Sequence, residues 1–303
     1  MAAASLRALL TRSIDYAGLF PPCSLELEPA LKKHADYTRS GDSWMLSTFV
    51  LPIAKFGDAE KFLSQFDKHH LLRVSALGPK TENAAAFQSE LKNTSDAIRS
   101  FQKAHADVLS IAQLEMVLPL DVDFAKLGAA AAVLSELKVQ AFLEGSAETA
   151  QETIALIART KQPALGYKLR TGGVTADAFP SSVQIARAIL ASTKHHVPIK
   201  FTAGLHHPVR AFREEVKTEM HGFLNVIGAG VLSAEHHWEE AQMVEMLEDQ
   251  RASSFEFHDT VFAWRDWEIT LDRIKARRKF VTSFGSCSFD EPREDLHALT
   301  FLS

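Results

Sequence analysis

The chain has 303 residues, of which 46% are hydrophobic and 23% are charged, and its formal net charge is -5. This composition supplies enough apolar material for a large core and excludes a chain that is disordered throughout. The 33 basic and 38 acidic residues are interspersed, so the sequence lacks the basic face that nucleic-acid-binding proteins carry.

The same sequence gives no sign of secretion or of membrane insertion. Its two cysteines, Cys23 and Cys287, do not form the pattern of a small disulfide-stapled domain. The N-terminal segment lacks the basic stretch and long apolar run of a signal peptide, and no segment reaches the ~18 consecutive apolar residues of a membrane span. We therefore expect a cytoplasmic protein with a small-molecule substrate and without a nucleic-acid or membrane partner. The oligomeric state is not indicated.

Segments of strand character alternate with amphipathic helical segments along the chain. Strands are predicted at residues 13–19, 44–51, 71–77, 111–118, 139–144, 164–171 and 197–206. Helices are predicted between them at residues 25–37, 58–69, 82–105, 123–137, 147–161 and 181–194. This alternation is typical of parallel strands joined by crossover helices. At this length it favours one (β/α)8-barrel domain over residues 1–303, with a doubly wound sheet as the alternative.

The eighth strand can be placed in two ways. Residues 221–227 would form it after a helix at residues 209–219, or residues 214–234 are largely helical and the strand lies at residues 280–284. We favour the second placement, because Phe223, Leu224, Ile227 and Val231 have helical spacing. The aromatic-rich residues 255–269 are then an excursion before the last strand, and a helix at residues 293–299 closes the chain.

Alternation inside four predicted strands indicates where a functional site lies. Successive side chains of a strand point to opposite faces, and in a barrel one face meets the helices while the other points inward. The inward face is polar on these strands: Gln113, Glu115, Glu144, Lys168, Arg170, Lys200, Thr202 and, just beyond, His206. Buried charges have to pair or to face a wet pocket. The pattern predicts either a structural ion-pair network or, as we favour, an active site at the carboxyl ends of the strands.

Residues 168–173 combine two cations with two glycines at the end of a strand. Backbone N–H groups of Thr171, Gly172 and Gly173 could form an anion-binding turn, with Lys168 and Arg170 adding positive charge. A tight turn without a ligand is the alternative. The motif predicts binding of a substrate carboxylate or phosphate.

Lysines on two neighbouring strands indicate amine chemistry. The order Lys200, Thr202, Gly204, at alternate positions, resembles the Schiff-base strand of the deoxyribose-phosphate aldolase family over a short stretch. The resemblance implies a class I lyase in which Lys200 forms a Schiff base with a carbonyl substrate and Lys168 activates it. Glu144 or Glu115 would be the general acid and base, and no cofactor would be needed.

Histidines suggest a different chemistry. His206 and His207 follow an inward-polar strand, and His221 lies a little further along the chain. With Glu144 they could bind a divalent metal and support a metal-dependent lyase, isomerase or hydrolase. A third hypothesis is a non-catalytic ligand-binding barrel whose charges are structural.

Other polar residues are placed near the pocket by the predicted elements. Asp15 would lie at or beneath the pocket and contribute to substrate binding if residues 13–19 form the first strand. His221 and Asn225 would face the pocket together if they share one helical face. Cys287, within residues 283–292, is more typical of a buried thiol than of a nucleophile.

Five segments together resemble a family of bacterial (β/α)8-barrel proteins. They are residues 15–22, 168–173, 200–208, 221–225 and 283–292. This resemblance implies the barrel fold and brings no particular activity with it.

Overall fold

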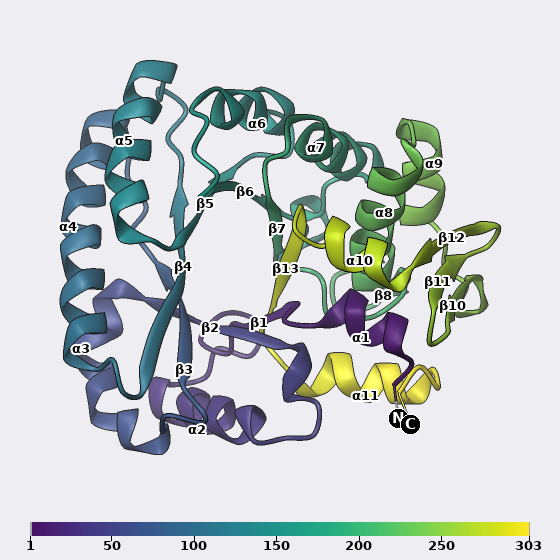
Figure 1. Cartoon of the computed structure of the whole chain (residues 1–303), viewed down its shortest axis with the longest axis horizontal. Coiled ribbons are helices and arrows are strands. Elements are labelled where there is room, and N and C mark those ends of the chain that lie inside the picture. The colour runs from purple at the N-terminus through teal and green to yellow at the C-terminus, as the bar shows by residue number, and fades with distance from the viewer. Residues whose placement is uncertain (1, 303) are drawn as a thin grey trace.

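Eight parallel strands close into a barrel in the computed structural model, which describes residues 2–302 (Figure 1). Around the barrel the strands follow the order β1-β13-β7-β6-β5-β4-β3-β2. Their bounds are β1 (Ile14–Tyr16), β2 (Leu46–Pro52), β3 (Leu72–Leu77), β4 (Leu109–Val117), β5 (Gln140–Gly145), β6 (Leu165–Arg170), β7 (Ile199–Thr202) and β13 (Val281–Ser286). The prediction of a (β/α)8 barrel is confirmed, with the eighth strand at the favoured position.

Helices connect the strands on the outside of the barrel (Figure 1). The longer ones in its first part are α2 (Leu27–Thr38), α4 (Ala84–Ala104), α5 (Phe124–Leu137), α6 (Ala150–Arg159) and α7 (Ser182–His195). Three of their starts are fixed locally, because the side chains of Asn83, Asp123 and Ser181 each accept a hydrogen bond from the backbone N–H three residues later. No helix in residues 2–302 has the length and apolar character needed to cross a bilayer.

The single helix predicted at residues 58–69 is wrong. The chain forms three short helical pieces instead, at η2 (Ile53–Lys55), α3 (Phe56–Ala59) and η3 (Glu60–Gln65). Beyond them, an Asp67 carboxylate oxygen accepts hydrogen bonds from the backbone N–H groups of His69 and His70. These bonds stabilise a turn, which competes with continuation of the helix.

The chain between β7 and β13 builds the largest departure from a plain barrel. A hairpin of β8 (Ala211–Arg213) and β9 (Thr218–Met220) precedes α8 (Phe223–His236) and α9 (Glu240–Leu247). The predicted helix at residues 214–234 therefore starts too early, since Lys217 takes a left-handed φ of 53° in the hairpin turn. Helix α8 is buried on all sides, since every residue from Phe223 to Ala234 is buried, and most of these residues are apolar.

The aromatic-rich excursion is confirmed as an antiparallel sheet. Its strands are β10 (Phe255–Phe257), β11 (Val261–Trp264) and β12 (Trp267–Thr270), and α10 (Leu271–Arg277) leads from them into β13. Trp238 packs edge-on against Trp264 and Trp267, with ring centroids 5.7 and 5.2 Å apart. Two helices close the ends of the chain, α1 (Ala4–Leu10), which contacts α10, and α11 (Asp290–Ala298), which follows β13.

His34 is a buried, neutral histidine in the packing between α2 and the barrel. Its ring is parallel to that of Tyr16 with centroids 6.1 Å apart, and its centroid lies 5.3 Å from that of Phe49. Nδ1 has no hydrogen-bond partner among the described residues. Burial lowers the pKa of His34 from 6.5 to about 3, so the fold holds the neutral form.

Acid should therefore destabilise this protein through His34. The unfolded chain binds a proton near the ordinary pKa while the folded chain does not, so stability is lost as the pH falls below 6.5. We expect a loss of about 2 kcal/mol between about pH 7 and about pH 5 from this residue, measured by urea unfolding. His34→Phe should reduce the pH dependence by that amount, and the exposed His258→Phe should not. An unchanged pH dependence in His34→Phe would contradict the assignment.

Candidate active site

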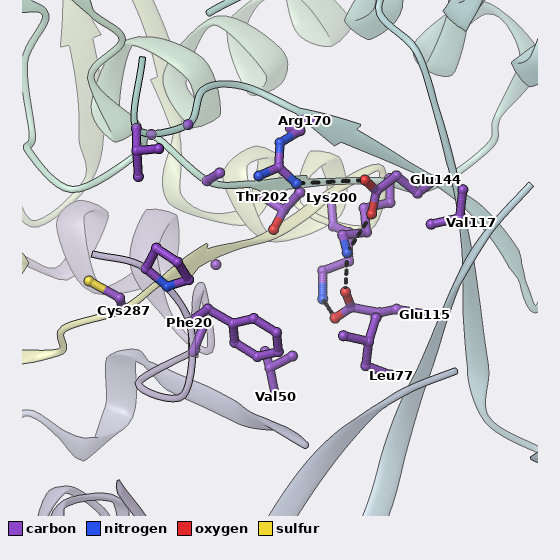
Figure 2. A pocket seen from close by; sticks show the side chains of 18 of the residues that line it. Phe20, Val50, Leu77, Glu115, Val117, Glu144, Arg170, Lys200, Thr202 and Cys287 are labelled. Carbon is purple, nitrogen blue, oxygen red and sulfur yellow. Dashed lines mark hydrogen bonds and ion pairs between the residues drawn. The ribbon is translucent and has the colours of Figure 1, made fainter. Parts of the chain in front are cut away.

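A cavity of about 540 Å³ lies at the carboxyl ends of the barrel strands (Figure 2). Its wall is partly apolar, with Phe20, Pro21 and Pro22 from the loop after β1 and Val50 and Leu77 from β2 and β3. The charged lining comes from the inward-facing side chains of the other strands: Glu115, Glu144, Lys168, Arg170 and Lys200. Strand alternation thus predicted the position of the cavity, where barrel enzymes place their active sites.

Every barrel strand contributes to one polar network beneath this cavity. Its members, in chain order, are Asp15, Thr48, Ser75, Gln113, Glu115, Glu144, Lys168, Lys200 and Ser283. Most of these side chains are buried. Because each charged group has partners, the cost of removing it from water is offset by ion pairs and hydrogen bonds.

Lys200 is almost completely buried in the network, with 1% of its side chain exposed. Its Nζ donates to Gln113 Oε1 at 2.7 Å and to Glu115 Oε1 at 2.6 Å, and lies 2.8 Å from Asp15 Oδ2. An ammonium group has three N–H donors. The three close acceptors around Lys200 Nζ, two in hydrogen bonds and one in an ion pair, match that number.

Asp15 supports this arrangement from below the cavity. Its two carboxylate oxygens accept from the hydroxyls of Thr48 and Ser283 at 2.5 and 2.6 Å, and the residue is completely buried. Asp15 does not line the cavity within the described residues. Asp15 thus lies beneath the pocket, in contact with Thr48, Ser283 and Lys200, and its predicted contribution to substrate binding stays a prediction.

Lys168 lies beside Lys200 and bridges two carboxylates. In register it pairs with Glu144 on β5 and with Lys200 on β7. Its Nζ is 2.6 Å from Glu115 Oε2 and 2.7 Å from Glu144 Oε2. Glu115 thus holds both lysines, one with each oxygen.

The pKa values in this group favour the charged forms. Burial by itself would lower the pKa of Lys168, but the adjacent carboxylates of Glu115 and Glu144 outweigh it and raise that pKa. Burial would likewise raise the pKa of Glu115, but Lys168 and Lys200 hold it well below its usual range. The resting network therefore contains a Lys168 ammonium and a Glu115 carboxylate.

The floor under the lysines is aromatic. The centroid of the Phe142 ring lies 5.3 Å from Lys200 Nζ, close enough for a cation–π interaction. Gly166 provides the room, because a Cβ at that position would lie 2.7 Å from Phe142 Cε1. A side chain at residue 166 would therefore displace the ring that supports Lys200.

Two exposed cations stand where the cavity meets a neighbouring one of about 1190 Å³. They are Arg170, whose Nη1 is 3.9 Å from Glu144 Oε1, and Lys80 in the loop after β3. Sequence reasoning missed Lys80, because a lone lysine in a Gly-Pro-Lys loop resembles an ordinary solvated residue. Thr48 and Ser75 were also missed, since one small hydroxyl on an apolar strand gives little signal.

The glycine motif after β6 has a mixed outcome. Gly173 lines the cavity, as does Thr202 at the end of β7. Gly172 is buried, and a Cβ there would lie 2.5 Å from Phe179 Cε1 and 2.8 Å from Gly204 Cα. The Thr171 hydroxyl donates to the backbone carbonyl of Ala203. Thr171 and Gly172 do not line the cavity in the described residues, and both join two loops by packing and hydrogen bonding. Their substrate-binding roles stay predictions.

His206 and His207 face carboxylates on α11. His206 lines the cavity, and its Nδ1 lies 3.1 Å from Glu291 Oε2. His207 Nδ1 lies 2.6 Å from Asp295 Oδ2. In residues 2–302 no group of three or more His, Cys, Asp or Glu side chains is arranged to hold a metal ion. The three histidines predicted as metal ligands thus do not form a common ligand set in the described chain.

His221 instead holds two loops together. Its Nε2–H donates to the Pro180 carbonyl at 2.8 Å, and Nδ1 accepts from Arg210 Nη1 at 2.9 Å. Burial, which outweighs the Pro180 bond and is assisted by Arg210, lowers the pKa of His221 to about 4. The imidazole is therefore neutral, and both of its nitrogens are engaged.

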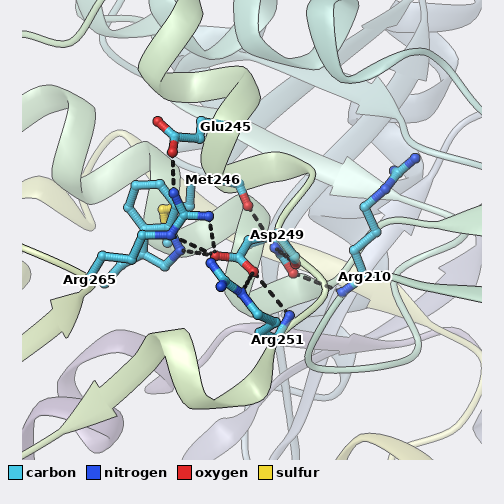
Figure 3. Close-up of polar contacts among 8 residues, drawn as sticks. Arg210, Glu245, Met246, Asp249, Arg251 and Arg265 are labelled. Atoms are coloured by element: carbon cyan, nitrogen blue, oxygen red, sulfur yellow. Dashed lines mark hydrogen bonds and ion pairs between the residues drawn. The ribbon is translucent and has the colours of Figure 1, made fainter.

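Asn225, predicted to bind substrate, is completely buried and does not line the cavity in the described residues. Its Oδ1 accepts from the Arg210 backbone N–H, and its Nδ2 donates to the carbonyls of Met246 and Asp249. Asp249 in turn accepts from Arg265 Nη2 at 2.8 Å (Figure 3). Asn225 lies inside α8 while His221 precedes that helix, so the two do not share the predicted helical face.

Comparison with known proteins finds distant structural likenesses and no match by sequence family. No protein-family model and no curated protein matches it. It is similar to two crystal structures of a proposed deoxyribose-phosphate aldolase from Toxoplasma gondii ME49. Both are 9% identical to this chain, and their TM-scores are 0.48 and 0.49. The matched regions cover 98% and 97% of this chain and 96% of the aldolase chain in each case. A proposed dihydrodipicolinate synthase family protein from Coccidioides immitis is 13% identical with a TM-score of 0.36, covering 64% of this chain and 61% of the other. These likenesses do not indicate a reaction, so the reaction is inferred from the residues of the site.

Proposed function

We propose that this chain is an aldolase-like lyase that acts through Lys168 on a small carbonyl compound carrying a carboxylate or phosphate. One observation carries the proposal: among the described residues, Lys168 Nζ has two carboxylate partners at the cavity wall, whereas Lys200 Nζ has three partners. Lys168 therefore keeps one N–H position for a substrate. The sequence suggested Lys200 as the reacting amine. We assign that role to Lys168 and a positioning role to Lys200.

Glu144 supplies the proton acceptor for a Schiff-base route. Its Oε2 lies 2.7 Å from Lys168 Nζ and takes the ammonium proton. The neutral amine attacks the carbonyl carbon, and the new C–N bond leaves an alkoxide that regains the proton from Glu144. Loss of water then gives an iminium ion, which draws the electron pair of a neighbouring C–C bond as that bond breaks.

The raised pKa of Lys168 favours a second route at the same residue. Because Glu115 and Glu144 stabilise the ammonium form, Lys168 can donate its free N–H to the substrate carbonyl oxygen without forming a covalent bond. Glu144 then removes a proton beside the polarised carbonyl as a general base. The electron pair moves to the oxygen, which Lys168 stabilises as an enolate.

Arg170 and Lys80 would bind the anionic group of the substrate. Both line the cavity, and the Arg170 side chain is 57% exposed, so its guanidinium is available to a ligand. A guanidinium can pair with a carboxylate or a phosphate through two parallel hydrogen bonds. With its anionic group bound there, the substrate would direct its reacting carbonyl toward Lys168.

Borohydride reduction tests the proposal and separates its two routes. The purified chain is incubated with pyruvate or glycolaldehyde phosphate, reduced, and analysed by intact mass and peptide mapping. The Schiff-base route predicts a stable adduct on Lys168 that is lost in Lys168→Arg and kept in Lys80→Arg. Binding of these compounds without any adduct favours the enolate route. If neither compound binds and neither is trapped, the proposed substrate class is wrong.

A further inference from the structure

Two cysteines from opposite ends of the sequence meet at the rim of the cavity. Cys23 lies in the loop between β1 and α2 and is exposed, and Cys287 directly follows β13 and is buried. Their Sγ atoms are 2.7 Å apart although the residues are separated by 264 positions. Both thiols are free. A disulfide requires its sulfur atoms at about 2.05 Å, so a small movement of either side chain would bring them into bonding range.

One cysteine of the pair, Cys287, lines the cavity, as does Phe20 (Figure 2). Pro21 and Pro22, from the loop that carries Cys23, also line it. The two loops leave adjacent strands, since β1 pairs with β13. A covalent bond here would join two segments that both contact whatever occupies the cavity.

We propose that Cys23 and Cys287 are a redox-modification site, at which a peroxide forms a disulfide that fixes this part of the cavity wall. The inference is independent of the reaction assigned to Lys168. The distance between the two sulfur atoms supports the pairing. The residues that line the cavity support an effect on its wall.

Accessibility decides the order of the two chemical steps. Hydrogen peroxide reaches exposed Cys23 first, transfers one oxygen to Sγ and leaves as water, giving a sulfenic acid. Cys287 is shielded, and burial followed by the contact with Cys23 raises its pKa to about 12, so it remains a thiol. Its sulfur then attacks Cys23 Sγ, the S–S bond forms, and the departing hydroxide takes the Cys287 proton as a second water. Two thiols and one peroxide thus give one disulfide and two waters.

The disulfide would restrict movement of the loop after β1. In the reduced protein, Ala17 N–H donates to the Ser286 carbonyl at 2.7 Å and ties the start of this loop to β13. Phe20, Pro21 and Pro22 lie beyond that bond. The disulfide adds a second connection after them and holds this apolar wall at its present place.

The test is graded oxidation of the reduced full-length chain, followed by alkylation of the remaining thiols. After hydrogen peroxide treatment we expect the intact mass to fall by two hydrogens and to show no alkylation. A non-reducing digest should yield one peptide pair that joins Cys23 to Cys287, and dithiothreitol should reverse both changes. The oxidised protein should melt about 5 °C higher than the reduced protein, because the cross-link restricts the unfolded chain.

Single variants provide the matched controls. Cys287→Ser should leave Cys23 to be oxidised without an internal cross-link, and Cys23→Ser should leave Cys287 reduced at the same peroxide dose. The proposal is overturned if wild-type Cys23 gains oxygen while Cys287 remains open to alkylation. It is equally overturned if the disulfides that form join two copies of the chain, and both results can be read from the wild-type protein alone.

Discussion

Replacement of Lys200 by methionine is expected to lower the free energy of unfolding by about 3–5 kcal/mol, the usual cost of removing one partner from a buried ion pair. Lys200 holds Asp15, Glu115 and Gln113 together from the centre of the barrel. Methionine fills similar volume but leaves the buried Asp15 without its cation. The lost stability is thus mainly the cost of an uncompensated charge.

Urea unfolding at neutral pH measures this effect, with Lys80→Met as the matched control. Lys80 lines the same cavity but is exposed, so its replacement should leave stability nearly unchanged. The double variant Lys200→Met/Asp15→Asn should recover part of the loss, because it removes the orphaned carboxylate. Equal stability of Lys200→Met and wild type would show that the ion pairs do not hold the barrel interior together.

Replacement of Glu144 by glutamine is expected to slow borohydride trapping at Lys168 by roughly 100-fold to 10,000-fold, the range of general acid–base catalysis. Glutamine keeps the shape of Glu144 and can still accept a hydrogen bond from Lys168, but it does not take up the ammonium proton. The residual rate should rise with pH more steeply than in wild type. Solvent base must then remove the proton from Lys168, whose ammonium form the Glu115 carboxylate still stabilises in this variant.

The rate of adduct formation across a pH series measures this effect, and Glu148→Gln is the control. Glu148 lines the neighbouring cavity and has no contact with Lys168 among the residues described. Its replacement should leave the rate and its pH profile unchanged. If Glu144→Gln traps substrate as fast as wild type, Glu144 does not accept the Lys168 ammonium proton. Glu115 would then be the remaining carboxylate in contact with Lys168.

These two experiments address one network that both stabilises the barrel and prepares its chemistry. The sequence offered a structural ion-pair network and an active site as alternative interpretations of the same charges. In the structure both lysines line the cavity, but Lys200 Nζ has three close acceptors and Lys168 Nζ has two. We propose that Lys200 positions Glu115, and that Glu115 in turn positions the lysine that meets the substrate.

The sequence by itself determined the barrel and the position of its cavity. Parallel strands with crossover helices follow from the alternation of segments, and inward charges follow from the two-residue period of a strand. Both are local patterns, so Glu115, Glu144, Lys168 and Lys200 could be placed on one inner face without knowledge of their partners. The excursion before β13 could also be predicted locally, because its aromatic residues cluster in the sequence.

Only the tertiary structure decided how those residues pair. Asp15 on the first strand reaches Lys200 on β7, and that contact gives Lys200 a third partner while Lys168 keeps two. Asn225 was predicted at the cavity from its helical spacing. Spacing does not show which neighbour accepts the hydrogen bonds of the side-chain amide, and in the structure these go to carbonyls at the end of α9. Cys23 and Cys287 meet because β1 closes the barrel against β13. Local spacing specifies which face a side chain occupies, whereas its partner depends on closure of the barrel, which brings residues far apart in sequence within a few ångströms.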